Sequence, residues 1–298
     1  MSNPDIHPDL QRIAKLTPRG IVGPRTLRLA RTVQAAATRM RAARHGVEAI
    51  TLPSGARLRL FRSLSATEPG PALVWVHGGG YVLGDARQDD SQCQRFSDCV
   101  GMTVASVDYR LAPEHPYPAP LEDCYSVLRW LTTLPGIDPS RIAIGGASAG
   151  GGLAAALALL ARDRGEIRPA FQLLVYPMLD DRSSQNPDNP NYRLWNPRSN
   201  AFGWSSYLGN ADPNIAVPAR RTDLHGLPPT WIGTCTNDMF YAEDLAYAER
   251  LRHSGIACDV EIVEGAFHGF DALAPKTPVA QQFFAKQCDA LRTALAPK

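Results

Sequence analysis

Short apolar runs alternate with helix-like segments along most of the chain. Six of these runs are short and rich in apolar and β-branched residues, as the strands of a sheet covered on both sides typically are. They are residues 72–76, 103–107, 141–145, 171–176, 230–235 and 258–263. The alternation predicts a doubly wound α/β core, with a mostly parallel sheet between two layers of helices. Upstream, a Pro-Ser-Gly turn within residues 48–62 predicts an antiparallel hairpin at the edge of that sheet.

Two segments do not follow this alternation. The first, residues 1–45, contains a basic amphipathic helix pattern in which Leu27, Val33 and Met40 lie among arginines. Such a pattern is typical either of a solvated flanking helix or of a cap over a binding site, and we keep both interpretations. We divide the chain at this point into residues 1–45, which are N-terminal cap helices in the second interpretation, and a core, residues 46–298.

The second exception is residues 180–223, which are rich in Asn, Pro and aromatic residues and interrupt the series of strands. A long irregular insertion in a compact domain usually serves as a lid or a binding loop, or else is disordered. Its aromatic side chains favour an ordered lid. They are Trp195, Phe202, Trp204 and Tyr207.

Composition and charge exclude several classes of protein. The chain of 298 residues is 44% apolar and 20% charged, which is typical of a soluble globular protein. Its 31 basic and 29 acidic residues give a net charge of +2, and no basic run suggests a surface that follows phosphates, so we expect no nucleic-acid partner. The longest small-apolar run, residues 150–161, is shorter than the roughly 20 residues that cross a bilayer, so we expect no integral membrane segment.

The first residues of the chain and the cysteine pattern indicate in which cellular compartment the protein is expected. Acidic residues and prolines occupy the first positions, where a secretory signal requires a basic start and an apolar stretch. The six cysteines show neither a C-x-x-C motif nor paired zinc-ligand spacing. We therefore expect a cytoplasmic protein with reduced, mostly buried thiols. These are Cys93, Cys99, Cys124, Cys235, Cys258 and Cys288.

The sequence GASAG places a candidate nucleophile, Ser148, between two glycines. A strand-like run before it and a helix-like run after it predict a sharp strand-to-helix turn, on which a serine hydroxyl is exposed for attack. Side chains two positions from the serine would collide in that turn, and Gly146 and Gly150 remove the collision. The alternative is a plain small-residue helix start. Both interpretations are compatible, because the turn requires that helix.

Attack of a hydroxyl on an acyl carbon generates an oxyanion, which needs preset hydrogen-bond donors. The sequence HGGG at residues 77–80 directly follows a predicted strand, and its glycines allow the backbone to approach a ligand closely. Beside the serine turn, this predicts an oxyanion hole made by the backbone N–H groups of Gly78, Gly79 and Ala149. His77 precedes the serine, and we expect it to be a structural hydrogen-bonding residue.

The acid and the general base are expected after the serine, in the order acid and then histidine. His268 lies in a Gly-containing loop just past the last predicted strand, whereas we expect His225 and His253 to be surface residues. Asp238 ends the preceding strand, where a carboxylate can orient the imidazole. The competing carboxylates, which we expect at an exposed helix start, are Glu243 and Asp244.

Five stretches carry a family resemblance: HGGGY, DYRLAPEHPYPAPLED, GASAGGG, TNDMFYAEDLAYAERL and FHGF. Together they resemble the bacterial hormone-sensitive-lipase-like esterases of the α/β-hydrolase fold, from about residue 70 to the end of the chain. The resemblance implies that Ser148, Asp238 and His268 form a catalytic triad beside the oxyanion hole. It also implies that residues 1–45 and residues 180–223 form a helical cap.

Two stretches depart from the usual family sequences. The serine turn of the family is G-D-S-A-G-G, where this chain has Ala147 in place of the acid. The family's acid motif is D-P-L-R-D-E, whereas Asp238 is followed here by Met-Phe-Tyr-Ala-Glu. Neither departure changes the triad.

The residues and the resemblance predict a carboxylic-ester hydrolase that works through a covalent acyl-enzyme, with no metal or organic cofactor. The expected substrates are small-molecule esters of short to medium acyl length. Two alternatives stay open: amide or peptide hydrolysis by the same triad, and a ligand-binding receptor on a hydrolase scaffold. Because similar enzymes commonly form homodimers, a homodimer is compatible with the resemblance. The residues expected to contact substrate are Tyr81, Trp195, Phe202 and Trp204.

Overall fold

A computed structural model describes residues 5–20, 22–40, 46–63 and 68–297 of the chain. Its centre is an eight-stranded sheet in the order β1-β2-β4-β3-β5-β6-β7-β8. The strands are β1 (Glu48–Thr51), β2 (Arg57–Phe61), β3 (Gly70–Val76), β4 (Thr103–Asp108), β5 (Ile137–Ala147), β6 (Phe171–Val175), β7 (Thr230–Asn237) and β8 (Cys258–Phe267). β2 pairs antiparallel with β1 and β4, and the other neighbouring pairs are parallel. The six predicted core strands and the edge hairpin are confirmed.

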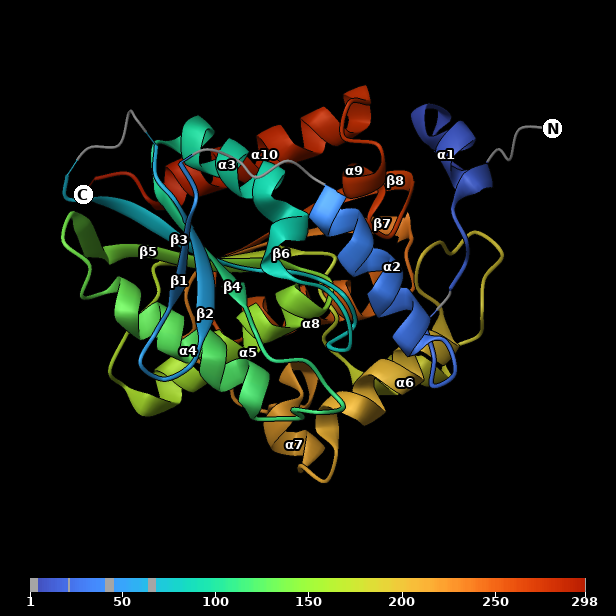
Figure 1. Cartoon of the computed structure of the whole chain (residues 1–298), viewed down its shortest axis with the longest axis horizontal. Helices are drawn as coiled ribbons and strands as arrows, with labels where there is room; N and C mark the ends of the chain where they lie inside the picture. The colour runs from blue at the N-terminus through green and yellow to red at the C-terminus, as the bar shows by residue number, and fades with distance from the viewer. Residues whose placement is uncertain (1–4, 21, 41–45, 64–67, 298) are drawn as a thin grey trace.

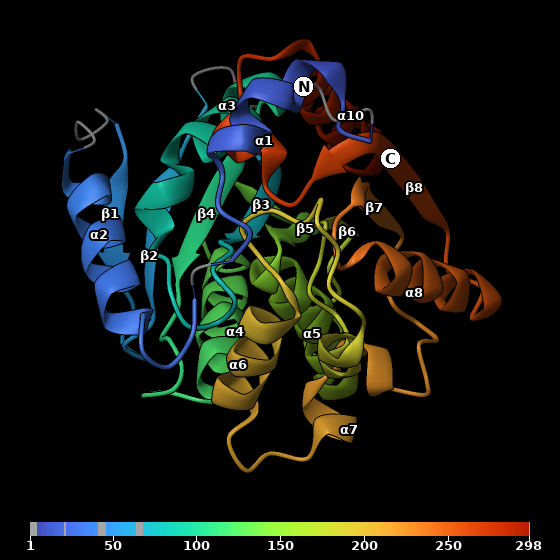
Figure 2. The same cartoon turned by 90° about the vertical axis from the view of Figure 1, so that its right-hand side faces the viewer.

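Helices cover both faces of the sheet, with α3 and α10 on one face and α4, α5 and α8 on the other (Figures 1 and 2). The α-helices are α1 (Gln11–Leu16), α2 (Leu27–Met40), α3 (Asp90–Val100), α4 (Ala119–Leu131), α5 (Ala149–Arg164), α6 (Pro197–Leu208), α7 (Pro213–Ala216), α8 (Tyr241–His253), α9 (Phe270–Leu273) and α10 (Pro278–Ala294). Short 3-10 helices are η1 (Pro8–Leu10), η2 (Ala86–Asp89), η3 (Asp181–Gln185) and η4 (Pro218–Arg220).

Strand β3 shows why the core strands read as continuous apolar runs. Val74 and Val76 pack under the helices of one face, and Leu73 and Trp75 pack under those of the other, as the two-residue period of a strand requires. All four side chains are fully buried. A strand covered on both sides therefore needs apolar residues at every position.

The parallel strands direct their carboxyl ends to one edge of the sheet, where ligands bind in open α/β folds. Ser148 directly follows β5, Asp238 directly follows β7 and His268 directly follows β8. Three candidate catalytic residues that are far apart in the sequence therefore meet at this edge, as predicted.

Two segments run across this edge. The backbone N–H of His7 donates to Gly265 O at 2.8 Å, beside the end of β8. Farther along, the N–H of Leu194, in the insertion, donates to Pro18 O at 2.8 Å. The insertion, residues 180–223, contains α6 and α7, and the structure describes all of it.

The basic amphipathic helix predicted near the N-terminus is α2, and only part of its apolar pattern is buried. Leu27 is buried, whereas Val33 is 60% exposed. The side chain of Met40 lies outside the described part of the chain. Val33 is exposed because the polar side of α2, which carries Arg31 and Gln34, contacts the rest of the protein.

All six cysteines are free, and all except Cys99 are buried, which confirms the prediction of mostly buried thiols. Among the helices of the described ranges, none combines the length and the apolar character that a membrane crossing requires.

Candidate active site

Ser148 occupies the sharp turn between β5 and α5. Its backbone φ is 57° and its ψ is −123°, a strained conformation for a residue with a side chain. A β carbon on Gly146 would overlap the carbonyl group of Gly150, and a β carbon on Gly150 would overlap that of Val76. The glycines on both sides of the serine are therefore required by close backbone packing.

His268 bridges Ser148 and Asp238. Its Nε2 lies 2.8 Å from Ser148 Oγ, and its Nδ1 lies 2.6 Å from Asp238 Oδ2. The other carboxylate oxygen of Asp238 accepts a hydrogen bond from the N–H of Phe240 at 3.0 Å, so both oxygens are held. All three predicted catalytic side chains are buried. In this arrangement the serine has a base within reach, and the base has an acid that orients it.

Two aromatic rings hold the imidazole from its sides. Tyr176 and Phe240 meet the His268 ring edge-on, with ring centroids 4.7 and 5.2 Å away. The hydroxyl of Tyr176 donates to Asp271 Oδ1 at 2.7 Å. Neither aromatic residue is among those predicted from the sequence to contact the triad. The available signal was their position, because each follows the carboxyl end of a core strand.

The predicted exposure of Glu243 and Asp244 is wrong, because both are buried in the first turn of α8. Glu243 Oε1 accepts hydrogen bonds from the N–H groups of Leu179 and Asp180 at 2.7 and 3.1 Å. Asp244 Oδ2 accepts one from Thr234 Oγ1 at 2.6 Å. Burial raises the pKa of Glu243 to about 8 and also raises the pKa of Asp244. Glu243 therefore binds the start of the insertion, and Asp244 binds strand β7. Of the three carboxylates, Asp238 contacts the imidazole.

The other two histidines after the serine, His225 and His253, are exposed, which confirms the prediction. Within the described ranges, no group of three or more His, Cys, Asp or Glu side chains could hold a metal ion.

The HGGG segment lies against the serine turn. A β carbon on Gly78 would lie 3.3 Å from the β carbon of Ser148, so this backbone comes close to the nucleophile. In the described part of the chain, the N–H groups of Gly78, Gly79 and Ala149 donate no hydrogen bond, which leaves them available to a ligand. His77 is fully buried, and its Nδ1 lies 2.8 Å from Gly78 O, as expected for a structural residue.

Aromatic side chains of the insertion pack beside this segment. A β carbon on Gly80 would overlap the ring of Trp195, so that ring lies directly on the backbone. Tyr81 contacts Trp204 at a centroid distance of 5.1 Å, and its hydroxyl donates to Met178 O at 3.1 Å. These three aromatic side chains are buried, and Phe202 is half-buried. The insertion therefore supports the loop that carries Gly78 and Gly79.

Comparisons with known proteins agree with this geometry. The family model described as alpha/beta hydrolase fold matches residues 73–272. Esterase LipI of Mycobacterium tuberculosis is 34% identical over 255 residues, which are 82% of this chain and 79% of that protein. Carboxylesterase NlhH of the same organism is 37% identical over 241 residues, which are 76% of this chain and 74% of that protein.

Two solved structures are similar over nearly the whole chain. A bacterial heroin esterase superposes with a TM-score of 0.89 at 35% identity, covering 99% of both chains. The esterase LipW from Mycobacterium marinum superposes with a TM-score of 0.83 at 35% identity, covering 100% of this chain and 99% of that one. By sequence, fold and arrangement of the site, the chain belongs to the hormone-sensitive-lipase-like esterase family of the α/β-hydrolase fold.

Proposed function

We propose that the chain is a serine carboxylesterase that hydrolyses small carboxylic esters through a covalent acyl-enzyme. The observation that carries this proposal is the continuous contact from Ser148 Oγ through the His268 imidazole to the Asp238 carboxylate. Its relatives are named esterases and carboxylesterases, which supports ester hydrolysis over amide hydrolysis and over ligand reception.

The first half of the reaction acylates the serine. His268 Nε2 accepts the proton of Ser148 Oγ as that oxygen bonds to the acyl carbon, and Asp238 stabilises the charged imidazole. The oxyanion of the tetrahedral intermediate accepts hydrogen bonds from the N–H groups of Gly78, Gly79 and Ala149. His268 then donates its proton to the leaving alcohol as the ester C–O bond breaks.

The second half releases the acid. A water molecule attacks the acyl carbon while His268 accepts its proton, and the oxyanion forms again at the same donors. The bond to Ser148 Oγ breaks, and His268 returns the proton to that oxygen. Because both halves use one base and one set of donors, no further protein group is required.

We propose that residues 1–45 and residues 180–223 form a cap over the acyl pocket. Support comes from the backbone contacts of residues 7 and 18 across the catalytic edge and from the packing of Trp195 and Trp204 beside the HGGG loop. A pocket of limited length favours short to medium acyl chains, because each further methylene gains free energy only while apolar walls surround it.

Three further proposals concern location and partners. A cytoplasmic location is supported by six free thiols. The absence of a nucleic-acid partner is supported by the relatives, which are named esterases. The proposal of a homodimer rests on the fact that similar enzymes commonly form homodimers. Light scattering of the purified chain tests it.

The substrate class is tested with p-nitrophenyl esters of increasing acyl length beside the matching anilides. We expect turnover of the esters, highest kcat/KM at short to medium length, and little turnover of the anilides. Ser148→Ala should hydrolyse neither substrate. Its matched control is Ser91→Ala, which changes an exposed serine on α3 and should keep full activity. Anilide turnover equal to ester turnover would contradict the proposal.

A further inference from the structure

Helix α2 turns its polar side toward the protein. The Nε of Arg31 donates to Val82 O at 2.7 Å, and its Nη1 pairs with Glu114 Oε1 at 2.7 Å. Gln34 Oε1 accepts a hydrogen bond from the N–H of Gly84 at 3.0 Å. These contacts hold the helix through hydrogen bonds and an ion pair.

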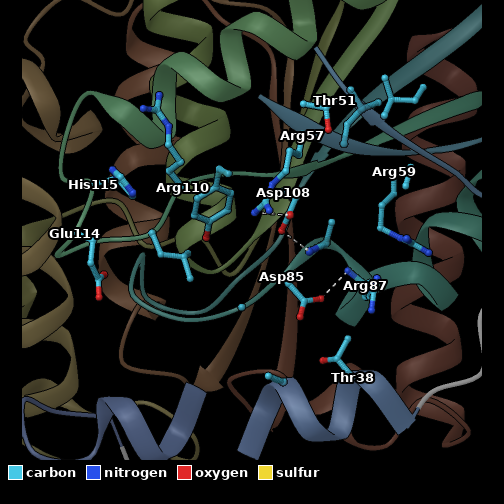
Figure 3. A pocket seen from close by; sticks show the side chains of 18 residues that line it. Thr38, Thr51, Arg57, Arg59, Asp85, Arg87, Asp108, Arg110, Glu114 and His115 are labelled. Carbon is cyan, nitrogen blue, oxygen red and sulfur yellow. Dashed lines mark hydrogen bonds and ion pairs between the residues drawn. The ribbon is translucent and has the colours of Figure 1, made fainter. Parts of the chain in front are cut away.

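A cavity of about 620 Å³, lined by both charged and apolar side chains, continues this inward side, between α2, the β1–β2 hairpin and the loop after β4. In Figure 3, Thr38 projects from α2 toward Asp85 and Arg87, and Asp108 lies beyond them beside Arg57. Along this part of the helix, α2 therefore faces an open space with several charged side chains. It does not pack there against a continuous apolar core.

The apolar side of α2 consequently faces solvent. Leu29 is 67% exposed and Val33 is 60% exposed, and Ala36 is also exposed. Their spacing of four and then three residues places them on one side of the helix. Figure 2 shows α2 at the left margin of the molecule, with no other element outside it. An amphipathic helix that packs with its polar side inward presents an apolar stripe to a partner.

The charge of the surrounding segment indicates what kind of partner fits. Residues 10–47 carry nine of the chain's 31 Lys and Arg residues and none of its 29 Asp and Glu residues, so the rest of the chain has 22 basic and 29 acidic residues. The chain therefore combines a strongly basic segment, residues 10–47, with a remainder of negative net charge. Its exposed basic residues include Arg12, Lys15, Arg25 and Arg28.

A second copy of the chain does not fit this surface. A two-fold dimer brings the same patch of both subunits together. Two such segments, each strongly positive, would repel one another. An anionic surface complements both features, because it attracts the basic side chains and accepts the apolar stripe.

We propose that the outer face of α2, formed by Leu29, Val33 and Ala36 with Arg25 and Arg28 beside them, docks the protein on the surface of an anionic phospholipid bilayer. A basic helix with an apolar stripe lies in the plane of such a surface, with the stripe among the lipid headgroups. Docking from the cytoplasmic side is compatible with the proposed location, since that leaflet carries anionic lipids.

The test is co-sedimentation of the full chain with vesicles of mixed phosphatidylglycerol and phosphatidylcholine, and with vesicles of phosphatidylcholine alone. We expect binding to the mixed vesicles at low salt, and much weaker binding at high salt or to the neutral vesicles. The double variant Leu29→Ser/Val33→Ser should bind about tenfold more weakly or worse, because the apolar area that enters the headgroup layer is lost. Arg25→Gln/Arg28→Gln should weaken binding and reduce its salt dependence.

The matched control is Ile215→Ser on α7, which removes an apolar side chain that is also 60% exposed and should leave binding unchanged. Circular dichroism and turnover of a water-soluble ester should be unchanged in all these variants. Ser148→Ala should bind vesicles as the wild type does, so failure of the proposed hydrolysis is distinguishable from failure of docking.

Three results would overturn the proposal. One is absence of binding to the anionic vesicles at low salt. Another is equal, salt-independent binding to anionic and neutral vesicles. The third is a wild-type dimer that Leu29→Ser/Val33→Ser converts to a monomer, since a second copy would then cover the apolar stripe.

Discussion

His268 is held at both ring nitrogens and on both sides of its ring. Asp238 and Ser148 contact the nitrogens, and Tyr176 and Phe240 contact the ring. A base fixed in this way loses little freedom when the proton moves, and its efficiency depends chiefly on the carboxylate that orients it.

At the scale of single residues, replacing an aspartate by asparagine distinguishes the roles of the two buried aspartates, Asp238 and Asp244. Asp238→Asn should lower kcat on the order of 10³- to 10⁴-fold, because the amide no longer stabilises the charged imidazole. Asp244→Asn should lower it less than about tenfold, since an amide resembles the neutral carboxyl that burial favours there. Steady-state kinetics on both folded variants measures this, and the reverse order would assign the acid to Asp244.

Glu243 should make stability depend on pH. Burial raises its pKa to about 8, so the native state keeps a proton that the unfolded chain releases near its ordinary pKa of ~4.3. The wild type should therefore lose stability as the pH rises between these values, by on the order of 5 kcal/mol, and Glu243→Gln should lack this loss. Urea denaturation of both proteins at several pH values measures the difference. Parallel pH profiles would show that Glu243 titrates normally.

The contact of Ser148, His268 and Asp238 is predictable from the sequence because the requirements of each residue are local. Gly146 and Gly150 are needed by the turn itself, and His268 and Asp238 directly follow strand ends. The burial of Glu243 is different, because its partners are the N–H groups of residues 179 and 180, far away in the sequence. No pattern near Glu243 indicates that contact.

At the scale of elements, the N-terminal segment and the insertion both lie at the catalytic edge, where residue 7 contacts β8 and residue 18 contacts the insertion. The central strands, such as β3, β4 and β6, are predictable because burial on both faces makes each one a nearly continuous apolar run. The existence of α2 is predictable as well. Its orientation is not, because the groups that bind its polar side, such as Val82 O and the N–H of Gly84, lie on a distant loop.

Removal of residues 1–45 tests the role of the N-terminal segment as a cap. The truncated protein should show a higher KM and an altered acyl-length profile, because part of the pocket wall is lost while the triad is retained. Kinetics with short and long p-nitrophenyl esters measure this after circular dichroism confirms the fold. Leu29→Ser/Val33→Ser is the matched control and should keep the wild-type KM, since these side chains face outward. Unchanged parameters in a folded truncation would make the segment a solvated flanking helix.

At the scale of the whole molecule, the sheet brings together residues that are 120 positions apart in the sequence. β5, β7 and β8 are parallel members of one sheet, so their carboxyl ends meet at one edge. The central claim is that Ser148, at the end of β5, is the nucleophile. All other roles at this edge depend on that claim.

The most direct test is reaction with an organophosphonate ester, followed by mass spectrometry of the digested protein. Ser148 Oγ should displace the leaving group on phosphorus and retain the phosphonyl group, and loss of ester turnover should parallel labelling. Ser148→Ala should take up no label and should hydrolyse no ester while keeping the wild-type circular dichroism spectrum. Label on another serine, or full activity in Ser148→Ala, would contradict the account.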